Sequence, residues 1–146
     1  MNRRIFFYGL YMDATLLESM GYHPRPLGAA RLDNHQIWIG ERATLAPEHG
    51  AAAYGILIDL PHREAVALYA RPEVRGYEPQ AVVATLLDDS SPQPAHAYVL
   101  PIEKAGMETN RAYADELAAL VYKLGLPTAY AQEIGNFAQG RNPGTL

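Results

Sequence analysis

The sequence predicts one α+β domain, in which a mostly antiparallel or mixed sheet curls around a hydrophobic core. An apolar strand-like segment and a short helical pattern open the chain. A block of strand-like segments that contains one helical pattern follows, and two helical patterns close the chain. Because strands and helices do not alternate one for one, this order favours α+β over a parallel α/β sheet. The length of 146 residues suits a single domain with a sizeable core.

The chain begins with a strand and a short helix. Residues 4–8 are nearly all apolar, which predicts a buried strand. A helix is expected from Asp13, a suitable N-cap, to Met20, since the apolar residues between them fall on one face. Gly21 ends this helix, and two prolines shortly after it prevent the helix from resuming.

The middle of the chain predicts most of the sheet. Asp33-Asn34 and the segment Pro47–Gly50 are turn-forming sequences that separate the first strands of this block. Pro61 suits the first turn of a helix that extends to about Ala70. The expected strands are residues 27–32, 35–39, 52–60, 81–87 and 95–100, with a polar hairpin loop over residues 88–94.

Two helices are predicted at the end of the chain. Asn110 is a suitable N-cap for a helix to Leu124, and Gly125 is the glycine expected just after it. Thr128 is expected to cap a last helix that extends to about Phe137. The longer helix is supported by one apolar stripe at helical spacing: Tyr113, Leu117, Leu120, Val121 and Leu124.

Composition and charge describe an ordinary globular chain. Hydrophobic residues make up 49% and charged residues 19%, and the net charge of −4 argues against a nucleic-acid partner. No apolar stretch has the length of a membrane span or the pattern of a signal peptide, so we expect a cytoplasmic protein with no membrane partner. One domain is expected over residues 1–138, followed by a polar tail over residues 139–146 that frays.

The residue types exclude several kinds of site. The chain has no cysteine, which excludes disulfides, iron–sulfur clusters, thiolate metal sites and a cysteine nucleophile. None of the five histidines is paired with another at metal-ligand spacing, so no metal site is expected. Ser90-Ser91 lies in a polar loop without a nucleophile-elbow pattern, which argues against a Ser/His/Asp hydrolase.

The most informative segment is the stretch from Ile5 to Asp13. An apolar run reaches Tyr8, Gly9 interrupts it, and a helical pattern begins at Asp13. A strand that leads through a glycine turn into a helix leaves several main-chain N–H groups unpaired and pointing the same way. Such a turn can bind a carboxylate or hold a developing oxyanion. The alternative is that Gly9 only allows the chain to turn.

Three motifs stand in a fixed order along the chain. They are Tyr8-Gly9-Leu10-Tyr11; Gly40-Glu41-Arg42-Ala43-Thr44-Leu45 followed by Tyr54-Gly55-Ile56-Leu57; and Gly125-Leu126-Pro127-Thr128-Ala129-Tyr130. In this order they resemble the γ-glutamylcyclotransferase-like (AIG2-like) family. There the segments read Tyr-Gly-Ser-Asn, then Gly-x-Ala-Thr-Leu/Ile with a later Gly-Val/Ile pair, then Gly-Leu-Pro-x-x-Tyr. The resemblance covers residues 4–135, nearly the whole chain.

The resemblance implies both a fold and a reaction. The implied fold is a small mixed β-barrel flanked by helices, with a cavity at its mouth. The implied reaction is an intramolecular acyl transfer, in which the α-amine of a γ-glutamyl group attacks its own γ-carbonyl and releases 5-oxoproline and an amine. This reaction requires positioning of the substrate, a general base and N–H donors for the oxyanion. It requires no metal or organic cofactor.

The position of the general base is where this sequence departs from the family pattern. In the family it is a glutamate in a Leu-Asp-x-x-Glu pattern, shortly before a tyrosine and a strand. Counting from Leu68 places Pro72 at that position and Glu73 one residue later. In one interpretation, Glu73 enters the cavity as the base, with Glu78 as the alternative, and partial burial raises the pKa of that carboxylate toward neutrality. In the other, both glutamates are solvated charges beside arginines and the base is lost.

The resemblance also implies a substrate-binding set. Leu10-Tyr11 stands where the family has Ser-Asn, which keeps the main-chain donors but removes a side-chain hydroxyl or amide at Leu10. Arg42 is a candidate for bidentate binding of a substrate carboxylate, and the alternative is a surface arginine at a turn. The candidate substrate-binding residues are Tyr8, Gly9, Leu10, Tyr11, Arg42 and Tyr77.

Two functions remain in competition at this point. The first is γ-glutamylcyclotransferase-like acyl transfer on a small γ-glutamyl amine or amino acid, with Glu73 as the base. The second is a non-catalytic domain of the same fold that binds a carboxylate-containing small molecule, because Pro72 stands where the glutamate belongs. A weaker third is a structural or interaction protein. The expected partner is a small molecule, and the oligomeric state is open, with a homodimer among the states allowed.

Overall fold

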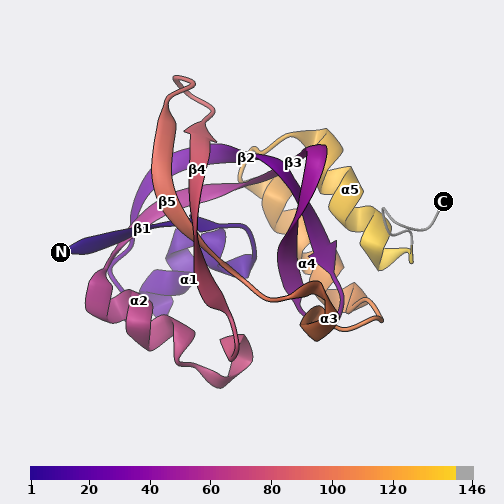
Figure 1. Cartoon of the computed structure of the whole chain (residues 1–146), viewed down its shortest axis with the longest axis horizontal. Helices are drawn as coiled ribbons and strands as arrows, with labels where there is room; N and C mark the ends of the chain where they lie inside the picture. The colour runs from indigo at the N-terminus through magenta and orange to yellow at the C-terminus, as the bar shows by residue number, and fades with distance from the viewer. Residues whose placement is uncertain (141–146) are drawn as a thin grey trace. The chain divides into compact units, whose positions relative to one another are not determined.

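The fold is built on a closed five-stranded barrel. A computed structural model describes residues 1–140, and in these residues the strands follow the order β1-β3-β2-β4-β5 around the barrel (Figure 1). The strands are β1 (Asn2–Phe7), β2 (Arg25–Ile39), β3 (Ala43–Pro61), β4 (Glu78–Leu86) and β5 (Pro92–Val99). The helices are α1 (Ala14–Ser19), α2 (His62–Tyr69), α3 (Ile102–Ala105), α4 (Arg111–Lys123) and α5 (Thr128–Ala138), with two 3-10 turns, η1 (Leu10–Met12) and η2 (Pro72–Val74). The predicted α+β class and mixed β-barrel are confirmed.

The chain divides into two compact units. Unit 1 comprises Met1–Asp33 and Tyr54–Val99, and unit 2 comprises Asn34–Ala53 and the chain from Leu100 onward. The single domain over residues 1–138 stays a prediction. Of the tail expected over residues 139–146, residues 141–146 lie outside the described residues. Among the helices of residues 1–140, none is long and apolar enough to cross a membrane.

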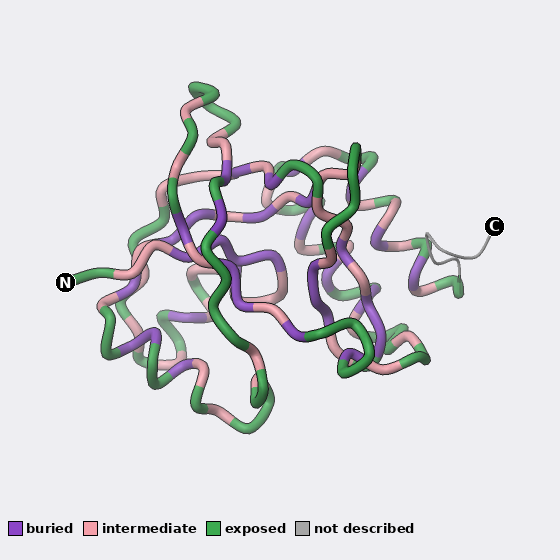
Figure 2. The backbone as a smooth tube through the Cα atoms, in the orientation of Figure 1, coloured by how far each residue is buried: buried purple, intermediate pink, exposed green. Residues whose placement is uncertain are grey.

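In unit 1, β1 is paired along both of its edges. It pairs antiparallel with β3 along its whole length, and in parallel with β5 at Ile5 and His96. Strand β4 pairs antiparallel with β5 and with β2, so the predicted mixture of antiparallel and parallel pairing is present. Residues 5–8 are fully or almost fully buried, as the purple run through β1 in Figure 2 shows. The apolar character of this segment therefore reflects burial on both faces, as predicted.

A glycine of the second motif allows β1 and β3 to approach closely. A Cβ built on Gly55 would lie 2.1 Å from the carbonyl oxygen of Phe7, the last residue of β1. Any other side chain at position 55 would therefore push against main chain rather than against a flexible side chain. Gly55 sets the spacing of β1 and β3 immediately before the Tyr8–Gly9 turn.

A second motif glycine has the same role in unit 2. A Cβ on Gly40 would lie 2.1 Å from the carbonyl oxygen of Gly106 and 2.5 Å from that of Ala105. The surrounding loop is held by main-chain bonds, in which Arg42 N donates to Ala105 O at 3.0 Å and Asn110 N donates to Gly40 O at 2.8 Å. The motif glycine is therefore required by close packing of the chain.

The two C-terminal helices are present as predicted, and their apolar residues are buried in unit 2. The Asn110 side chain caps α4 by accepting a hydrogen bond from Tyr113 N at 3.0 Å, and Gly125 ends the helix with a φ of 78°. Helices α4 and α5 pack against each other, and the Trp38 ring meets the Phe137 ring edge-on at 6.0 Å. One detail is wrong, because the N-cap of α5 is Pro127 and Thr128 is its first helical residue. The buried core residues include Leu117, Val121, Ile134 and Phe137.

Two predicted turns do not exist as chain reversals. Asp33-Asn34 lies inside β2, and Pro47–Gly50 lies inside β3, so strands expected to be short are 15 and 19 residues long. Asn34 and Gly50 do adopt left-handed backbone angles, with φ of 60° and 85°. The amide of Gly50 donates to the Asn34 side-chain oxygen at 3.0 Å. The turn-forming residues are therefore accommodated as local irregularities within extended strands.

Smaller differences concern the ends of elements. Strand β4 begins at Glu78, earlier than predicted. It ends at Leu86 and β5 begins at Pro92, so the hairpin loop between them is shorter than the predicted residues 88–94. Helix α2 begins at His62, with Pro61 as its N-cap. The short helix α3 and the turns η1 and η2 were not expected, because segments of three or four residues carry too few positions for a periodic pattern.

Replacing Gly55 by alanine tests the close approach of β1 and β3. We expect Gly55→Ala to lower the free energy of unfolding by about 2–3 kcal/mol, because main chain has to move. Gly135→Ala is the matched control. Gly135 lies within α5 with nothing within 4 Å of a Cβ. This control should be neutral or stabilising by about 0.5–1 kcal/mol. Urea unfolding measures both, and equal stabilities of Gly55→Ala and the wild type would contradict the geometry.

Thr44 offers a second test, in unit 2. Its buried hydroxyl donates to Leu100 O at 2.6 Å and accepts from Leu100 N at 2.8 Å. Thr44→Val keeps the shape but leaves both main-chain groups unpaired, so we expect a loss of about 2–4 kcal/mol in thermal unfolding. Thr85→Val, at a half-exposed position of β4, should change stability by less than about 0.5 kcal/mol. Equal losses in the two variants would show that the Thr44 bonds contribute nothing specific.

Candidate active site

The glycine loop follows directly from the end of β1. Gly9 has a φ of −108° and a ψ of −156°, extended angles that other residues also adopt, so the backbone angles there do not require glycine. Met12 N donates to Gly9 O at 3.0 Å and Asp13 N donates to Leu10 O at 3.2 Å, which closes η1. The N–H groups of Leu10 and Tyr11 stand at the beginning of this turn, where they have no partner inside it.

Two neighbours fix the ends of this loop. The Tyr8 hydroxyl is buried and donates to Tyr98 O in β5 at 2.6 Å, so this residue ties β1 to β5. On the other side, the Asp13 carboxylate caps α1 by accepting from Thr15 N at 3.0 Å, as predicted. The loop is therefore held at both ends by hydrogen bonds. The Tyr11 ring packs edge-on against Phe7 at 6.5 Å.

The end of α1 brings another tyrosine to the same place. Gly21 takes a left-handed φ of 92°, and Tyr22 N donates back to Leu17 O at 3.1 Å. This is the hydrogen-bond pattern with which a glycine commonly closes a helix. It directs Tyr22 toward Arg71, whose guanidinium is hydrogen-bonded to the Tyr22 side chain.

Arg71 and Glu73 form an ion pair beside this loop. The Arg71 Nε donates to Glu73 Oε1 at 2.5 Å, and the two side chains are 42% and 50% exposed. Both residues lie at η2, just after α2. The Tyr11 side chain is also hydrogen-bonded to Arg71, and the negative charge of Glu73 raises the pKa of its phenol. The charge of Glu73, the predicted base candidate, therefore reaches the phenol of Tyr11, the last residue of the predicted glycine loop.

The charges in this cluster shift the pKa values of its members. Burial raises the pKa of Tyr11, and the negative charge of Glu73 raises it further, while Arg71 opposes both effects. The hydrogen bond from Arg71 lowers the pKa of Glu73 below its ordinary value. A general base requires the opposite direction, so in the protein alone Glu73 is a solvated ion-paired carboxylate.

The other predicted site residues lie elsewhere or remain untested. Glu78 is exposed at the first position of β4, opposite Val99. Tyr77 is partly buried just before it, with its main-chain N–H donating to Val74 O at 3.3 Å. Arg42 belongs to unit 2, and Glu73 belongs to unit 1. The roles of all three, and that of Glu73 as the base, stay predictions.

Sequence reasoning missed two members of the cluster, Arg71 and Tyr22. In the sequence, Arg71 is recognisable only as a charge near Glu73, and Tyr22 belongs to no motif or periodic pattern. A signal did exist for Arg71, because a basic residue two positions before an acidic one at a proline turn can form a local ion pair. Tyr22 is placed only by the geometry of the α1 end. In residues 1–140, no group of three or more His, Asp or Glu side chains is placed to hold a metal ion.

Comparison with solved structures shows the fold. A γ-glutamyl cyclotransferase matches 100% of this chain and 91% of its own, with a TM-score of 0.76 and 14% identity. YkqA from Bacillus subtilis matches 98% of this chain and 56% of its own, with a TM-score of 0.78 and 19% identity. A γ-glutamyl cyclotransferase specific to glutathione, from yeast, matches 97% of each chain, with a TM-score of 0.56 and 13% identity.

These matches extend over nearly the whole of this chain at low identity. No protein-family model matches the sequence, and no curated protein matches it either. The resemblance drawn from the three motifs is therefore confirmed at the level of the fold, which this chain shares with γ-glutamyl cyclotransferases and an AIG2-like protein.

The proximity of Glu73 to the glycine loop is testable without an activity assay. We expect Glu73→Gln to lower the pKa of Tyr11, because it removes a negative charge and leaves Arg71 beside the phenol. NMR titration of tyrosines labelled with ¹³C at Cζ measures this pKa, with Tyr11→Phe to assign the signal. Glu78→Gln is the control and should leave it unchanged. A Tyr11 pKa unaffected by Glu73→Gln would separate this carboxylate from the loop.

Proposed function

We propose that this protein is a γ-glutamylcyclotransferase-like enzyme, which cyclises the γ-glutamyl group of a small amine or amino acid to 5-oxoproline. Two observations support the proposal. The chain shares its fold with γ-glutamyl cyclotransferases. The observation that carries it is local to unit 1, where a half-exposed Arg71–Glu73 ion pair stands at η2 and the charge of Glu73 acts on Tyr11 of the glycine loop.

The Arg71–Glu73 pair suits the amino-acid end of a γ-glutamyl compound. That end carries an ammonium and a carboxylate on one carbon, and the protein presents a guanidinium and a carboxylate joined by a 2.5 Å hydrogen bond. A bound substrate replaces the internal pair with two intermolecular ones, its carboxylate on Arg71 and its ammonium on Glu73. Because both side chains are about half exposed, this exchange requires little rearrangement.

The same exchange prepares Glu73 to act as a base. In the free protein, Arg71 holds the pKa of Glu73 down, which makes the carboxylate a weak base. When a substrate carboxylate binds Arg71, the guanidinium is divided between two carboxylates. It then lowers the pKa of Glu73 less, and the basicity of Glu73 rises. Substrate binding and activation of the base are then coupled through one arginine. This coupling reconciles the ion pair of Glu73 with its proposed role as the base.

The reaction then proceeds with balanced proton transfers. Glu73 takes a proton from the substrate ammonium, and the freed amine attacks the γ-carbonyl carbon, forming the new N–C bond of the five-membered ring. In this proposal the N–H groups of Leu10 and Tyr11 stabilise the developing oxyanion. Collapse breaks the bond to the leaving amine, which receives the first proton from Glu73 as it departs. The new ring nitrogen then loses its second proton through Glu73 to the same amine, so the products are 5-oxoproline and the amine in its ammonium form, and no co-reactant is consumed.

A second candidate is a non-catalytic domain that binds a carboxylate-containing small molecule. It is favoured by the exposed position of Glu73, by the lowered pKa of Glu73 and by Pro72, which occupies the strict position of the family's glutamate. Such a domain would use the same Arg71 and the same main-chain donors, without turnover. Carboxylate ligands would then raise its melting temperature while no 5-oxoproline is formed.

Release of 5-oxoproline from γ-glutamyl amines and γ-glutamyl amino acids tests the first candidate. We expect the wild-type protein to release it, and Glu73→Gln to slow release by at least about 100-fold, since general bases contribute roughly 10²–10⁴ in rate. Glu18→Gln removes an exposed carboxylate from α1 and should retain full activity.

Three outcomes would change the assignment. Activity unchanged by Glu73→Gln would remove this residue from the role of base. Loss of activity in Glu78→Gln, with Glu73→Gln still active, would move the role to Glu78. Absence of release from every γ-glutamyl donor, together with thermal stabilisation by those donors, would establish the non-catalytic candidate in place of the enzyme.

A further inference from the structure

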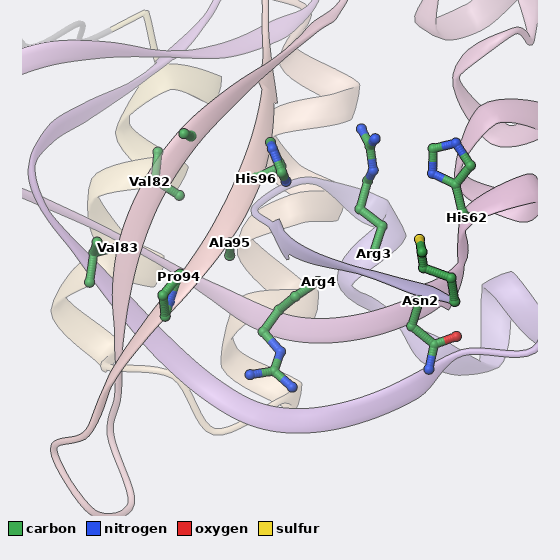
Figure 3. A pocket seen from close by; sticks show the side chains of 11 residues that line it. Asn2, Arg3, Arg4, His62, Val82, Val83, Pro94, Ala95 and His96 are labelled. Carbon is green, nitrogen blue, oxygen red and sulfur yellow. The ribbon is translucent and has the colours of Figure 1, made fainter.

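A cavity lies in unit 1, and no residue of the glycine loop lines it. It has a volume of about 710 Å³ and is lined by the beginning of β1, the first residue of α2, and parts of β4 and β5 (Figure 3). None of the residues proposed for γ-glutamyl chemistry lines it. Its size is that of a small-molecule site.

Basic side chains from three elements reach this cavity. Arg3 comes from β1, His62 from α2 and His96 from β5, and Figure 3 shows the three side chains extending to the same side of β1. No aspartate or glutamate is among the lining residues. We call this hollow, with Arg3, His62 and His96 at one side, the cationic cavity. A site with this lining attracts anions.

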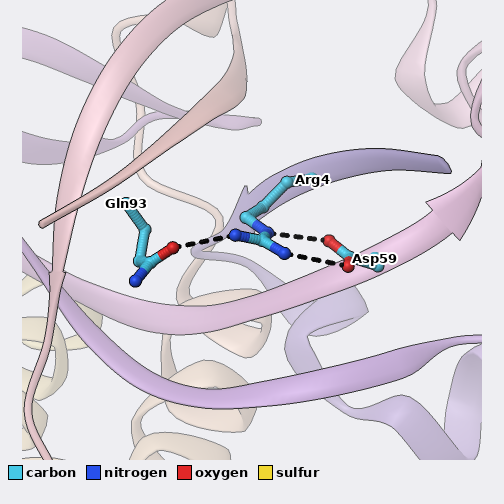
Figure 4. Close-up of polar contacts among 3 residues, drawn as sticks. All are labelled: Arg4, Asp59 and Gln93. Atoms are coloured by element: carbon cyan, nitrogen blue, oxygen red, sulfur yellow. Dashed lines mark hydrogen bonds and ion pairs between the residues drawn. The ribbon is translucent and has the colours of Figure 1, made fainter. Parts of the chain in front are cut away.

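Arg4 also lines the cavity, but its charge is compensated. Its guanidinium donates to both carboxylate oxygens of Asp59, at 2.9 and 3.2 Å, and to Gln93 Oε1 at 2.8 Å (Figure 4). The Asp59 charge is compensated by the same pair. Arg4 therefore contributes to the lining of the cavity, but we do not expect its guanidinium to bind a ligand.

Arg3 is held in place without an acidic partner. Its Nη1 donates to the Tyr98 hydroxyl at 2.8 Å, and the Tyr98 ring is stacked on the Tyr69 ring at 3.7 Å. Among residues 1–140, no carboxylate lies within ion-pair distance of Arg3, whereas Arg4, Arg31 and Arg71 each have one. Arg3 is thus positioned by a neutral group, and its positive charge is available to a ligand.

Part of the cavity lining is apolar. Val82 and Ala95 are buried lining residues of β4 and β5, and Val83 and Pro94 beside them are exposed, Val83 to 58%. An exposed valine beside a cationic group suits a ligand that has both an apolar part and a charged part. The lining therefore selects for an amphipathic anion over an inorganic one.

We propose that the cationic cavity binds a small organic phosphate. A phosphate monoester presents three terminal oxygens, which match three donor side chains on different elements, and the guanidinium fork of Arg3 fits two of them. A carboxylate carries one oxygen fewer and at most a single negative charge, so a phosphate monoester suits three donor side chains on different elements better. The organic group of the ligand packs on Val82 and Pro94. No bond is made or broken in this site, and it is independent of the proposed cyclotransferase chemistry.

Calorimetric titration with phenyl phosphate at constant ionic strength tests this site. We expect the wild-type protein to bind phenyl phosphate and Arg3→Gln to weaken binding at least tenfold. Arg63→Gln is the matched control, since Arg63 is exposed next to His62, does not line the cavity and carries the same charge. It should change the affinity less than twofold. Equal weakening by the two variants would reduce the effect to net charge and overturn the proposal.

Further measurements keep the proposal falsifiable if Arg3→Gln folds poorly. His96→Gln should also weaken binding, and in the wild-type protein the NMR signals of Arg3, His62 and His96 should shift on addition of phenyl phosphate. Benzoate that binds as tightly as phenyl phosphate, or shifts confined to residues outside the cavity, would overturn the phosphate assignment. Inorganic phosphate that binds as tightly would overturn the role of the apolar lining. Glu73→Gln should retain phenyl phosphate binding, which separates this site from the proposed active site.

Discussion

The placement of β1 between β3 and β5 is the constraint on which both sites of unit 1 depend. This strand pairs antiparallel with β3 over its whole length and in parallel with β5 at Ile5 and His96. Its apolar residues are buried, so its register cannot slip without exposing them. The glycine loop begins where β1 ends, and Arg3 lines the cationic cavity where β1 begins. The two proposed sites therefore lie at the two ends of one strand.

The motifs that carry the resemblance are mostly architectural. Gly55 and Gly40 are required because main-chain oxygens lie 2.1 Å from where their Cβ atoms would be. Gly125 ends α4 with a φ of 78°, and Leu126 beside it is buried. A protein that keeps this barrel needs these residues whether or not it turns over a substrate. They therefore establish the fold, and the question of function depends on Tyr11 and its charged neighbours.

Three arginines of unit 1 stand in three different electrostatic situations. Arg4 is committed to Asp59 and Gln93, and all three groups are satisfied within the protein. Arg71 is paired with Glu73 in an exposed pair of the kind that contributes about 0–1 kcal/mol to stability, so a ligand can replace the partner with little loss. Arg3 is fixed by a neutral hydroxyl and has no carboxylate nearby in residues 1–140. The two proposals therefore place ligand binding on Arg71 and Arg3, and leave to Arg4 a role within the protein.

The sequence alone determined the features that depend on neighbouring residues. These are the caps at Asp13 and Asn110, the glycine that ends α4, the buried run of β1 and the order of motifs that indicated the fold. The tertiary structure decided the rest. The local sequence predicts turns at Asn34 and Gly50, since both residues favour turn conformations. Pairing between long strands outweighs this preference and keeps them within β2 and β3. Contacts between distant segments, such as those of Tyr11 with Arg71, depend on where whole elements end, and a sequence pattern records only what lies within a few residues.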